Sequence, residues 1–74
     1  MRGFLLEHSR VDFKAARDPR RTRIAVIAAN RKEAFALAAA LLPMVGLRLL
    51  DEGPEALRAA EAAGVDRGEA KILT

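Results

Sequence analysis

Two consecutive segments decide the fold: TRIAVIAA at residues 22–29 and NRKEAFALAAALL at residues 30–42. The first is β-branched and almost wholly apolar, which favours a central strand covered on at least one face. Asn30 stands where a helix begins, because its side-chain oxygen can accept a bond from the free amides of a first turn. Glu33 completes a pattern like a capping box. We therefore predict a strand that passes directly into a helix.

The predicted helix has one apolar face. Four of its members recur at the i, i+3, i+4 and i+7 spacing, and two leucines widen the stripe: Phe35, Ala38, Ala39, Leu42, Leu37 and Leu41. Pro43 disfavours helical geometry in the residue before it, so we expect the helix to end near Leu42.

The chain before residue 22 predicts a partner strand. Residues 4–8 are a short apolar run, and residues 11–15 alternate between apolar and charged side chains. The apolar positions are even in the first run and odd in the second, so we expect a bulge or turn near Ser9. A polar cluster with proline at residues 17–21 predicts a turn. Together these segments predict an antiparallel hairpin with a basic tip.

The second half of the chain predicts a strand over 47–50, a turn at 51–53 and a helix that starts at Pro54. Gly64 with Val65 after it is typical of a helix end with a hydrophobic closing contact. Residues 66–74 are either a short edge strand, at 70–73, or a disordered tail. The narrow apolar side of this helix is expected to comprise Leu57, Ala60 and either Ala56 or Ala63.

These elements predict one small domain over residues 1–74, of the α/β (α+β) class with the order ββαβα(β). Residues 23–50 favour a right-handed parallel βαβ unit. A second helix returning to the same face of the sheet would complete a two-layer sandwich. The other face would then expose Ala25 and Ile27, so we expect these residues to be dimer contacts.

The composition indicates a thin core. The apolar share is 51%, but alanine supplies much of it, and cysteine, tryptophan and tyrosine are absent. With no cysteine and one histidine, neither a disulfide nor a zinc finger can stabilise the fold. Because a short chain with few large core residues needs other support, we expect self-association. The longest uncharged stretch, residues 34–47, is too short to span a bilayer, and we expect a cytoplasmic protein without membrane contact.

The net charge of +3 is unevenly distributed. Residues 1–32 carry an excess of basic side chains, and residues 33–74 carry an excess of acidic ones. A basic ribbon can contact nucleic-acid phosphates or an acidic partner, although a solvated basic loop has the same appearance. Base stacking is not expected, because the three phenylalanines belong to the predicted core. The basic residues of the hairpin are Arg10, Lys14, Arg17, Arg20, Arg21 and Arg23.

No pattern of catalytic residues stands out. His8 and Ser9 are neighbours on a predicted strand, so their side chains should point to opposite faces. The acidic group Asp51, Glu52 and Glu55 offers oxygen ligands for Mg²⁺ or Ca²⁺, but acids near a helix N-terminus are also favoured by the helix dipole.

The junction from Asn30 to Lys32 is a second place where an anion can bind, at the start of a helix. No glycine-rich loop precedes it, which favours a plain helix cap. The sequence therefore predicts a non-catalytic interaction or assembly module without a cofactor, self-associating through its sheet. The alternative is a nucleic-acid-binding module that uses the basic hairpin with little sequence specificity.

Overall fold

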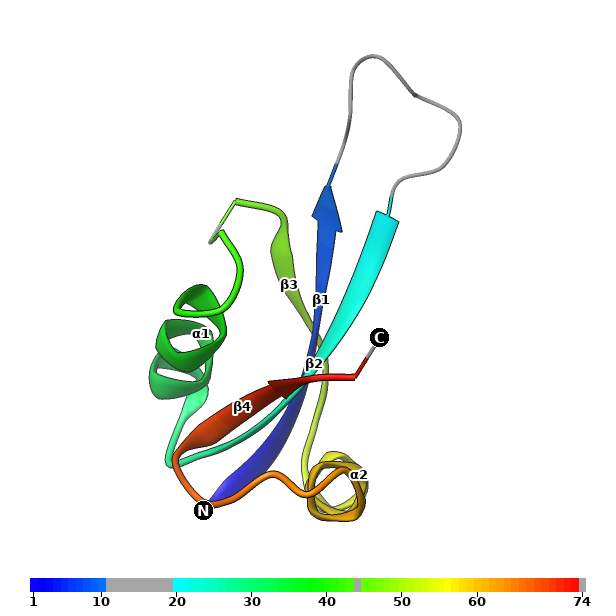
Figure 1. Ribbon diagram of the computed structural model, residues 1–74. Coiled ribbons are helices and arrows are strands. Elements are labelled where there is room, and N and C mark those ends of the chain that lie inside the picture. The colour runs from blue at the N-terminus through cyan, green and yellow to red at the C-terminus, as the bar shows by residue number, and fades with distance from the viewer. Residues whose placement is uncertain (11–19, 44, 74) are drawn as a thin grey trace.

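The computed structural model describes residues 1–10, 20–43 and 45–73. Four strands and two helices follow one another in the predicted order, ββαβαβ (Figure 1). The last strand is present, so the edge-strand alternative for the C-terminal residues is the one confirmed. The elements are β1 (Arg2–Arg10), β2 (Arg20–Ala28), α1 (Arg31–Ala39), β3 (Leu47–Glu52), α2 (Pro54–Ala62) and β4 (Glu69–Ile72).

The strands form one sheet in the order β3-β1-β2-β4, and every neighbouring pair is antiparallel. The predicted hairpin of β1 and β2 is confirmed, with Phe4 opposite Val26 and Leu6 opposite Ile24. The predicted parallel βαβ unit is wrong. Because the hairpin places β1 on one side of β2 and β4 takes the other side, β3 pairs with the free edge of β1 instead.

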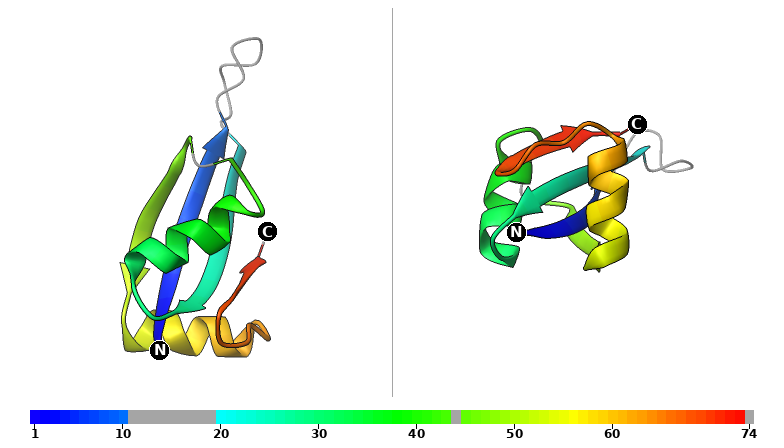
Figure 2. Two further views of the ribbon diagram at one scale, coloured as in Figure 1. Left: turned by 90° about the vertical axis from the view of Figure 1, so that its left-hand side faces the viewer. Right: turned by 90° about the horizontal axis from the view of Figure 1, so that it is seen from below.

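The two helices lie on opposite faces of the sheet, as both views of Figure 2 show. The prediction that they share one face is therefore wrong. The reason lies in β2, which is apolar on both sides: Ile24 and Val26 join the core under α1, and Ala25 and Ile27 join the one under α2. Each face needs its own cover, and each crossover supplies one helix.

The face under α1 holds the large side chains. Among the described residues, the largest fully buried side chains are Phe4, Leu6, Ile24 and Val26. Helix α1 adds buried Ala34 and Ala38 to this core. It ends at Ala39 rather than near Leu42, and a turn follows in which the amide of Leu42 donates to the carbonyl of Ala38 at 3.0 Å. Leu41, predicted to widen the apolar stripe of the helix, lies in this turn and is 46% exposed.

The face under α2 is built from small residues in close contact. A Cβ on Gly3 would lie far inside contact distance of the backbone nitrogen and Cα of Leu57. Only glycine therefore allows β1 and α2 to approach so closely. Ala56 and Ala60 are buried while Leu57 and Ala63 are partly buried, which confirms the predicted apolar side of this helix.

The local signals for the helix ends are confirmed. Oδ1 of Asn30 accepts a bond of 2.9 Å from the amide of Glu33. Pro54 occupies the first turn of α2. At the other end of α2, the amide of Val65 donates to the carbonyl of Ala60, and Gly64 takes a φ of 82° with its amide bonded to Glu61. This is the Schellman arrangement, in which glycine relieves the strain of a left-handed backbone.

Of the bulge or turn predicted near Ser9, a bulge in the pairing of β1 with β2 is absent from the described residues. This strand pairs with β2 without a break from Arg2 to Arg10. The register shift lies instead between β1 and β3, at Leu5 and Leu6, where Leu50 is the extra residue of β3. The alternating residues 11–15 that suggested a switch of faces lie outside the described residues. Within those that are described, no helix is long and apolar enough to cross a membrane.

Candidate functional site

His8 and Ser9 lie on opposite faces of β1, as their positions in the sequence predict. His8 is 6% exposed and stands opposite Thr22 on β2 and Leu47 on β3. The amide of Ser9 donates to the carbonyl of Gly46 at 3.1 Å, so this serine helps to dock the start of β3. The two side chains do not form a catalytic pair.

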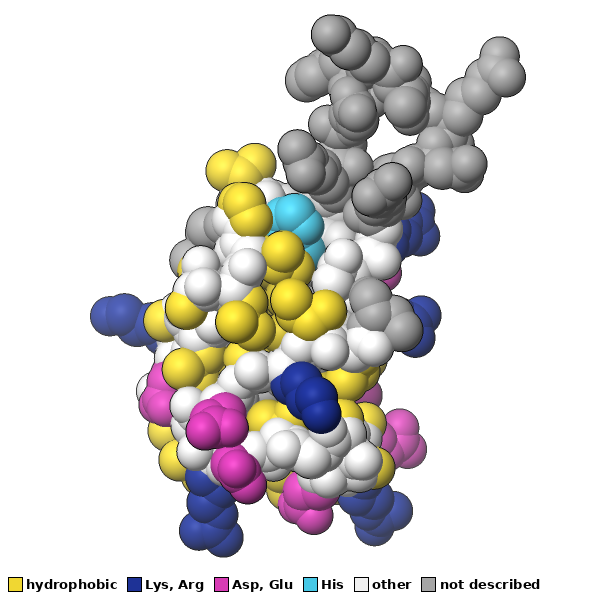
Figure 3. All heavy atoms as spheres, viewed as in Figure 1, with side chains coloured by type: hydrophobic (Ala, Val, Ile, Leu, Met, Phe, Trp, Pro, Cys, Tyr) yellow, Lys and Arg dark blue, Asp and Glu magenta, His cyan; other side chains and the backbone are white. Residues whose placement is uncertain are grey.

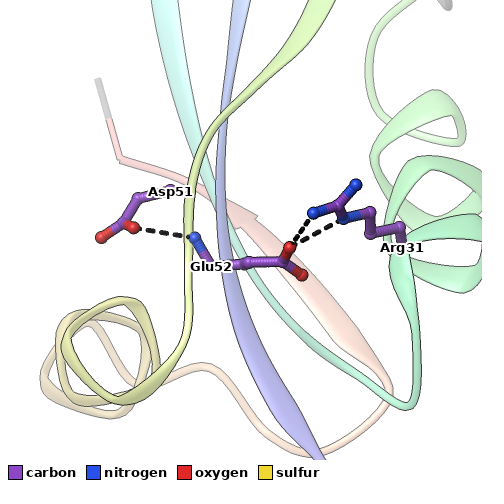
Figure 4. A network of polar contacts seen from close by, with 3 residues as sticks. All are labelled: Arg31, Asp51 and Glu52. Carbon is purple, nitrogen blue, oxygen red and sulfur yellow. Dashed lines mark hydrogen bonds and ion pairs between the residues drawn. The ribbon is translucent and has the colours of Figure 1, made fainter.

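Two members of the acidic group near the start of α2, Asp51 and Glu52, form separate polar contacts (Figure 4). Glu52 forms an ion pair with Arg31 at the start of α1, and Nε of Arg31 donates to Oε1 of Glu52 at 2.7 Å. Oδ1 of Asp51 accepts from the amide of Glu52 at 2.9 Å. Across the described parts of the chain, no three His, Cys, Asp or Glu side chains are grouped closely enough to hold a metal ion.

The ion pair changes the titration of both its members. The hydrogen bond from Arg31, together with the charge of its guanidinium, holds the pKa of Glu52 below its usual value. The same bond and the carboxylate charge raise the pKa of Arg31. The pair joins α1 to the end of β3. Arg31 is therefore engaged with a carboxylate, and Asn30 serves as a helix cap at the junction where an anion site was considered.

The basic hairpin is only partly within the described residues. Arg10, the last residue of β1, pairs with Arg20, the first residue of β2. Arg21 and Arg23 are exposed on β2, and by the alternation of the strand they belong to the face that carries Ala25 and Ile27. Lys14 and Arg17 lie outside the described residues.

A buried carboxylate lies on the same face. Glu7 is 5% exposed, stands opposite Arg23 on β2 and opposite Arg48 on β3. Nη2 of Arg48 lies 3.0 Å from Oε1 of Glu7, an ion pair without an aligned hydrogen bond. Sequence reasoning missed this pair because it requires the strand order, which places β1 between the two arginine-bearing strands.

Ala25 and Ile27, the predicted dimer contacts, are 1% and 3% exposed within the single chain. They pack with Ala60 and Val65 under α2. They were expected to contact a second copy because their face of the sheet was expected to be uncovered. Helix α2 covers that face where these two residues lie. Neither side chain is therefore exposed for contact with a second copy.

The two edges of the sheet differ. Edge β3 is interrupted by the extra residue Leu50. After this residue, Oδ1 of Asp51 accepts a hydrogen bond from the amide of Glu52. That amide points away from β1, because the amide of the next residue, Gly53, donates toward β1, to the carbonyl of Gly3 at 3.1 Å. A bulge and a side chain bound to the outer backbone both hinder the addition of another strand.

Edge β4 pairs with β2 in a single register, although at its start the amide of Glu69 donates to the carbonyl of Asp66. The amide of Leu73 donates to the carbonyl of Arg23 at 2.8 Å, so Lys71 and Leu73 turn their backbone groups to β2. The amides and carbonyls of Ala70 and Ile72 consequently point outward, away from β2. In the sheet as described, no strand pairs with the outer side of β4. The right-hand view of Figure 2, seen from below, shows β4 at the border of the sheet.

Hydrophobic side chains gather on the side of the molecule that carries β4. They lie next to α1 in the space-filling view (Figure 3). Ile72, on β4 itself, is 42% exposed, and Ala70 is partly buried against the core under α1.

Comparisons with protein-family models, curated proteins and solved structures find no match to this chain. The interpretation of these surfaces therefore depends on their geometry alone.

Proposed function

We propose that this chain is a non-catalytic interaction module that self-associates through the edge of its sheet at β4. The observation that carries the proposal is the pair of outward-facing backbone units at Ala70 and Ile72 on a strand with no outer neighbour among the described residues. Exposed strand edges of this kind bind another strand by backbone hydrogen bonds.

The small core supports the same proposal. The fully buried large side chains are few, as the composition predicts. Several large apolar side chains are exposed in the described ranges, among them Leu41 at 46%, Val45 at 87% and Ile72 at 42%. Association with a second copy would remove part of this surface from water and stabilise the fold by mass action.

Sedimentation equilibrium over a range of concentrations tests the proposal. We expect a mass near twice the 8.0 kDa of the chain, falling toward 8.0 kDa on dilution. The substitution Ala70→Pro removes an outward amide while leaving the ladder to β2 intact, so it should give a monomer. Ala70→Gly keeps the amide and serves as the control. If Ala70→Pro unfolds the chain, Ile72→Lys provides a second test, since its side chain is exposed. A wild-type mass of 8.0 kDa at the highest concentration would contradict the proposal.

A second candidate function is nucleic-acid binding, favoured by the exposed arginines Arg21, Arg23 and Arg48 on one face of the sheet. Binding to a random-sequence duplex and to a single strand should weaken with salt by roughly 0.9 log units per log unit of salt for each duplex phosphate neutralised. Charge reversal at Arg21 and Arg23 should abolish it, whereas Arg58→Glu on α2 should not. Absence of binding at low salt would rule this function out.

A further inference from the structure

We infer that the second copy docks in one register, antiparallel and two-fold symmetric about Ala70 of β4, with Glu69 of each copy opposite Lys71 of the other. This inference rests on the proposed function and specifies its partner and geometry. It follows from two features of β4: the direction of its backbone groups and the order of its charges.

The direction of the backbone groups limits the pairings. Ala70 and Ile72 present their amide and carbonyl outward, while Lys71 and Leu73 turn theirs toward β2 and the amide of Glu69 donates to the carbonyl of Asp66 at 3.1 Å. In an antiparallel pair, outward residues must stand opposite outward residues. A symmetric pair can therefore be centred on a residue of β4, but not on a peptide bond between two residues.

The order of charges selects among those centres. Centring on Glu69 or on Lys71 would place two like charges directly opposite each other, which is destabilising. Centring on Ile72 would leave Glu69 beyond the paired segment. Centring on Ala70 bonds its outward amide and carbonyl to those of the second copy. It also places both Glu69 side chains opposite Lys71 side chains.

The surroundings accept this arrangement. Glu69 and Lys71 stand opposite Ile27 and Ala25 on β2, so both charged side chains lie on the face of α2. Nζ of Lys71 donates to the carbonyl of Ala63 at 2.8 Å, and an ammonium retains two further donors for a carboxylate.

On the opposite face, the exposed Ile72 would lie near Gly68 of the second copy, beyond the paired strands, because the amide of Gly68 donates to the carbonyl of Ile27 at 2.7 Å. An ideal Cβ on Gly68 would meet no atom of its own chain within 4 Å. The small side chain of Ala70 at the symmetry axis leaves room for the two copies to approach. Burial of both Ile72 side chains would add apolar contact to the backbone bonds.

Charge reversal tests the register. In Glu69→Lys, and separately in Lys71→Glu, both cross-strand pairs become repulsive, so the dimer dissociation constant should rise by about tenfold or more at low salt. An equimolar mixture of these two variants should associate better than either alone, because every pair between them is attractive. The double variant E69K/K71E should recover the wild-type constant. Glu55→Lys, an exposed change on α2, is the matched control.

The outcomes separate the register from the proposed function. A wild-type dimer whose constant is unchanged in both single variants would overturn the register and leave self-association standing. A monomeric wild-type chain would overturn both. Circular dichroism of each variant identifies any loss of folding, and recovery in the mixture or the double variant cannot be produced by unfolded chains.

Discussion

The two faces of the sheet bury their surface in different ways. The face under α1 uses large side chains, with Phe4, Leu6, Ile24 and Val26 filling the space beneath the helix. The face under α2 uses small ones, and the helix backbone lies against Gly3 with no side chain between them. On that side, close van der Waals contact between the backbones takes the place of large buried side chains.

This difference teaches that one strand can serve two kinds of packing. In β2, Ile24 and Val26 alternate with Ala25 and Ile27, so the same segment supplies both cores. The face under α1 should be sensitive to the loss of volume, and the face under α2 to its addition. The first two of the following substitutions test that contrast, the other two test local polar contacts, and all four run from the largest expected effect to the smallest.

Phe4→Ala should have the largest effect, because it leaves a cavity among fully buried neighbours. Truncation of a buried phenylalanine costs about 3–5 kcal/mol, a large part of the stability of a small domain. We expect loss of cooperative thermal unfolding, measured by circular dichroism. Phe35→Ala, at a partly buried position of α1, is the control and should cost less. An equal effect at both positions would contradict the description of this core.

Gly3→Ala should come next, although it adds only one methyl group. The new Cβ would overlap the backbone of Leu57, so α2 must move away from β1. Overpacking of this kind costs about 1–3 kcal/mol. Chemical denaturation measures the change, and Arg2→Ala, at the exposed neighbouring position, is the control. Unchanged stability of Gly3→Ala would show that α2 does not approach β1 so closely.

Asn30→Ala should destabilise the protein by about 1 kcal/mol, the usual cost of losing a side-chain cap. The effect should be specific to α1, because α2 starts at Gly53 and Pro54 without a side-chain cap. Asn30→Asp retains an acceptor and should remain close to wild type. A midpoint of urea denaturation that falls equally in both variants would argue against the capping bond.

Glu52→Gln should have the smallest effect, and that effect should depend on pH. Because Arg31 lowers the pKa of Glu52, the carboxylate stabilises the folded chain above its ordinary pKa. This contribution disappears as the pH falls through the lowered pKa. We therefore expect a higher Tm for wild type near neutral pH and a difference that narrows in acid. A difference independent of pH would exclude the ion pair as its cause.

Local signals in the sequence predicted the elements well. Asn30, Pro54 and Gly64 act through neighbouring backbone atoms, so their roles as caps and stops need no knowledge of the rest of the chain. The hairpin followed from the same local reasoning. The nearly continuous apolar run of β2 also indicated a central strand, with Ala25 and Ile27 on its second apolar face.

What the sequence could not show was which segments meet. The preference for a parallel crossover assumed that β2 and β3 are neighbours, yet β1 lies between them. With that error, both helices were assigned to one face and Ala25 and Ile27 to a dimer. The pairing of Glu7 with Arg48 and the open edge of β4 also depend on strand order, which short-range patterns do not record.

The strand order also has a consequence for how the chain folds. The hairpin of β1 and β2 forms the central pair, and each outer strand has only one of these two as its neighbour. The centre can therefore assemble before either edge, whereas β3 and β4 each require a strand of the hairpin as a template. Substitutions in the hairpin should chiefly slow folding, while those in β4 should chiefly accelerate unfolding.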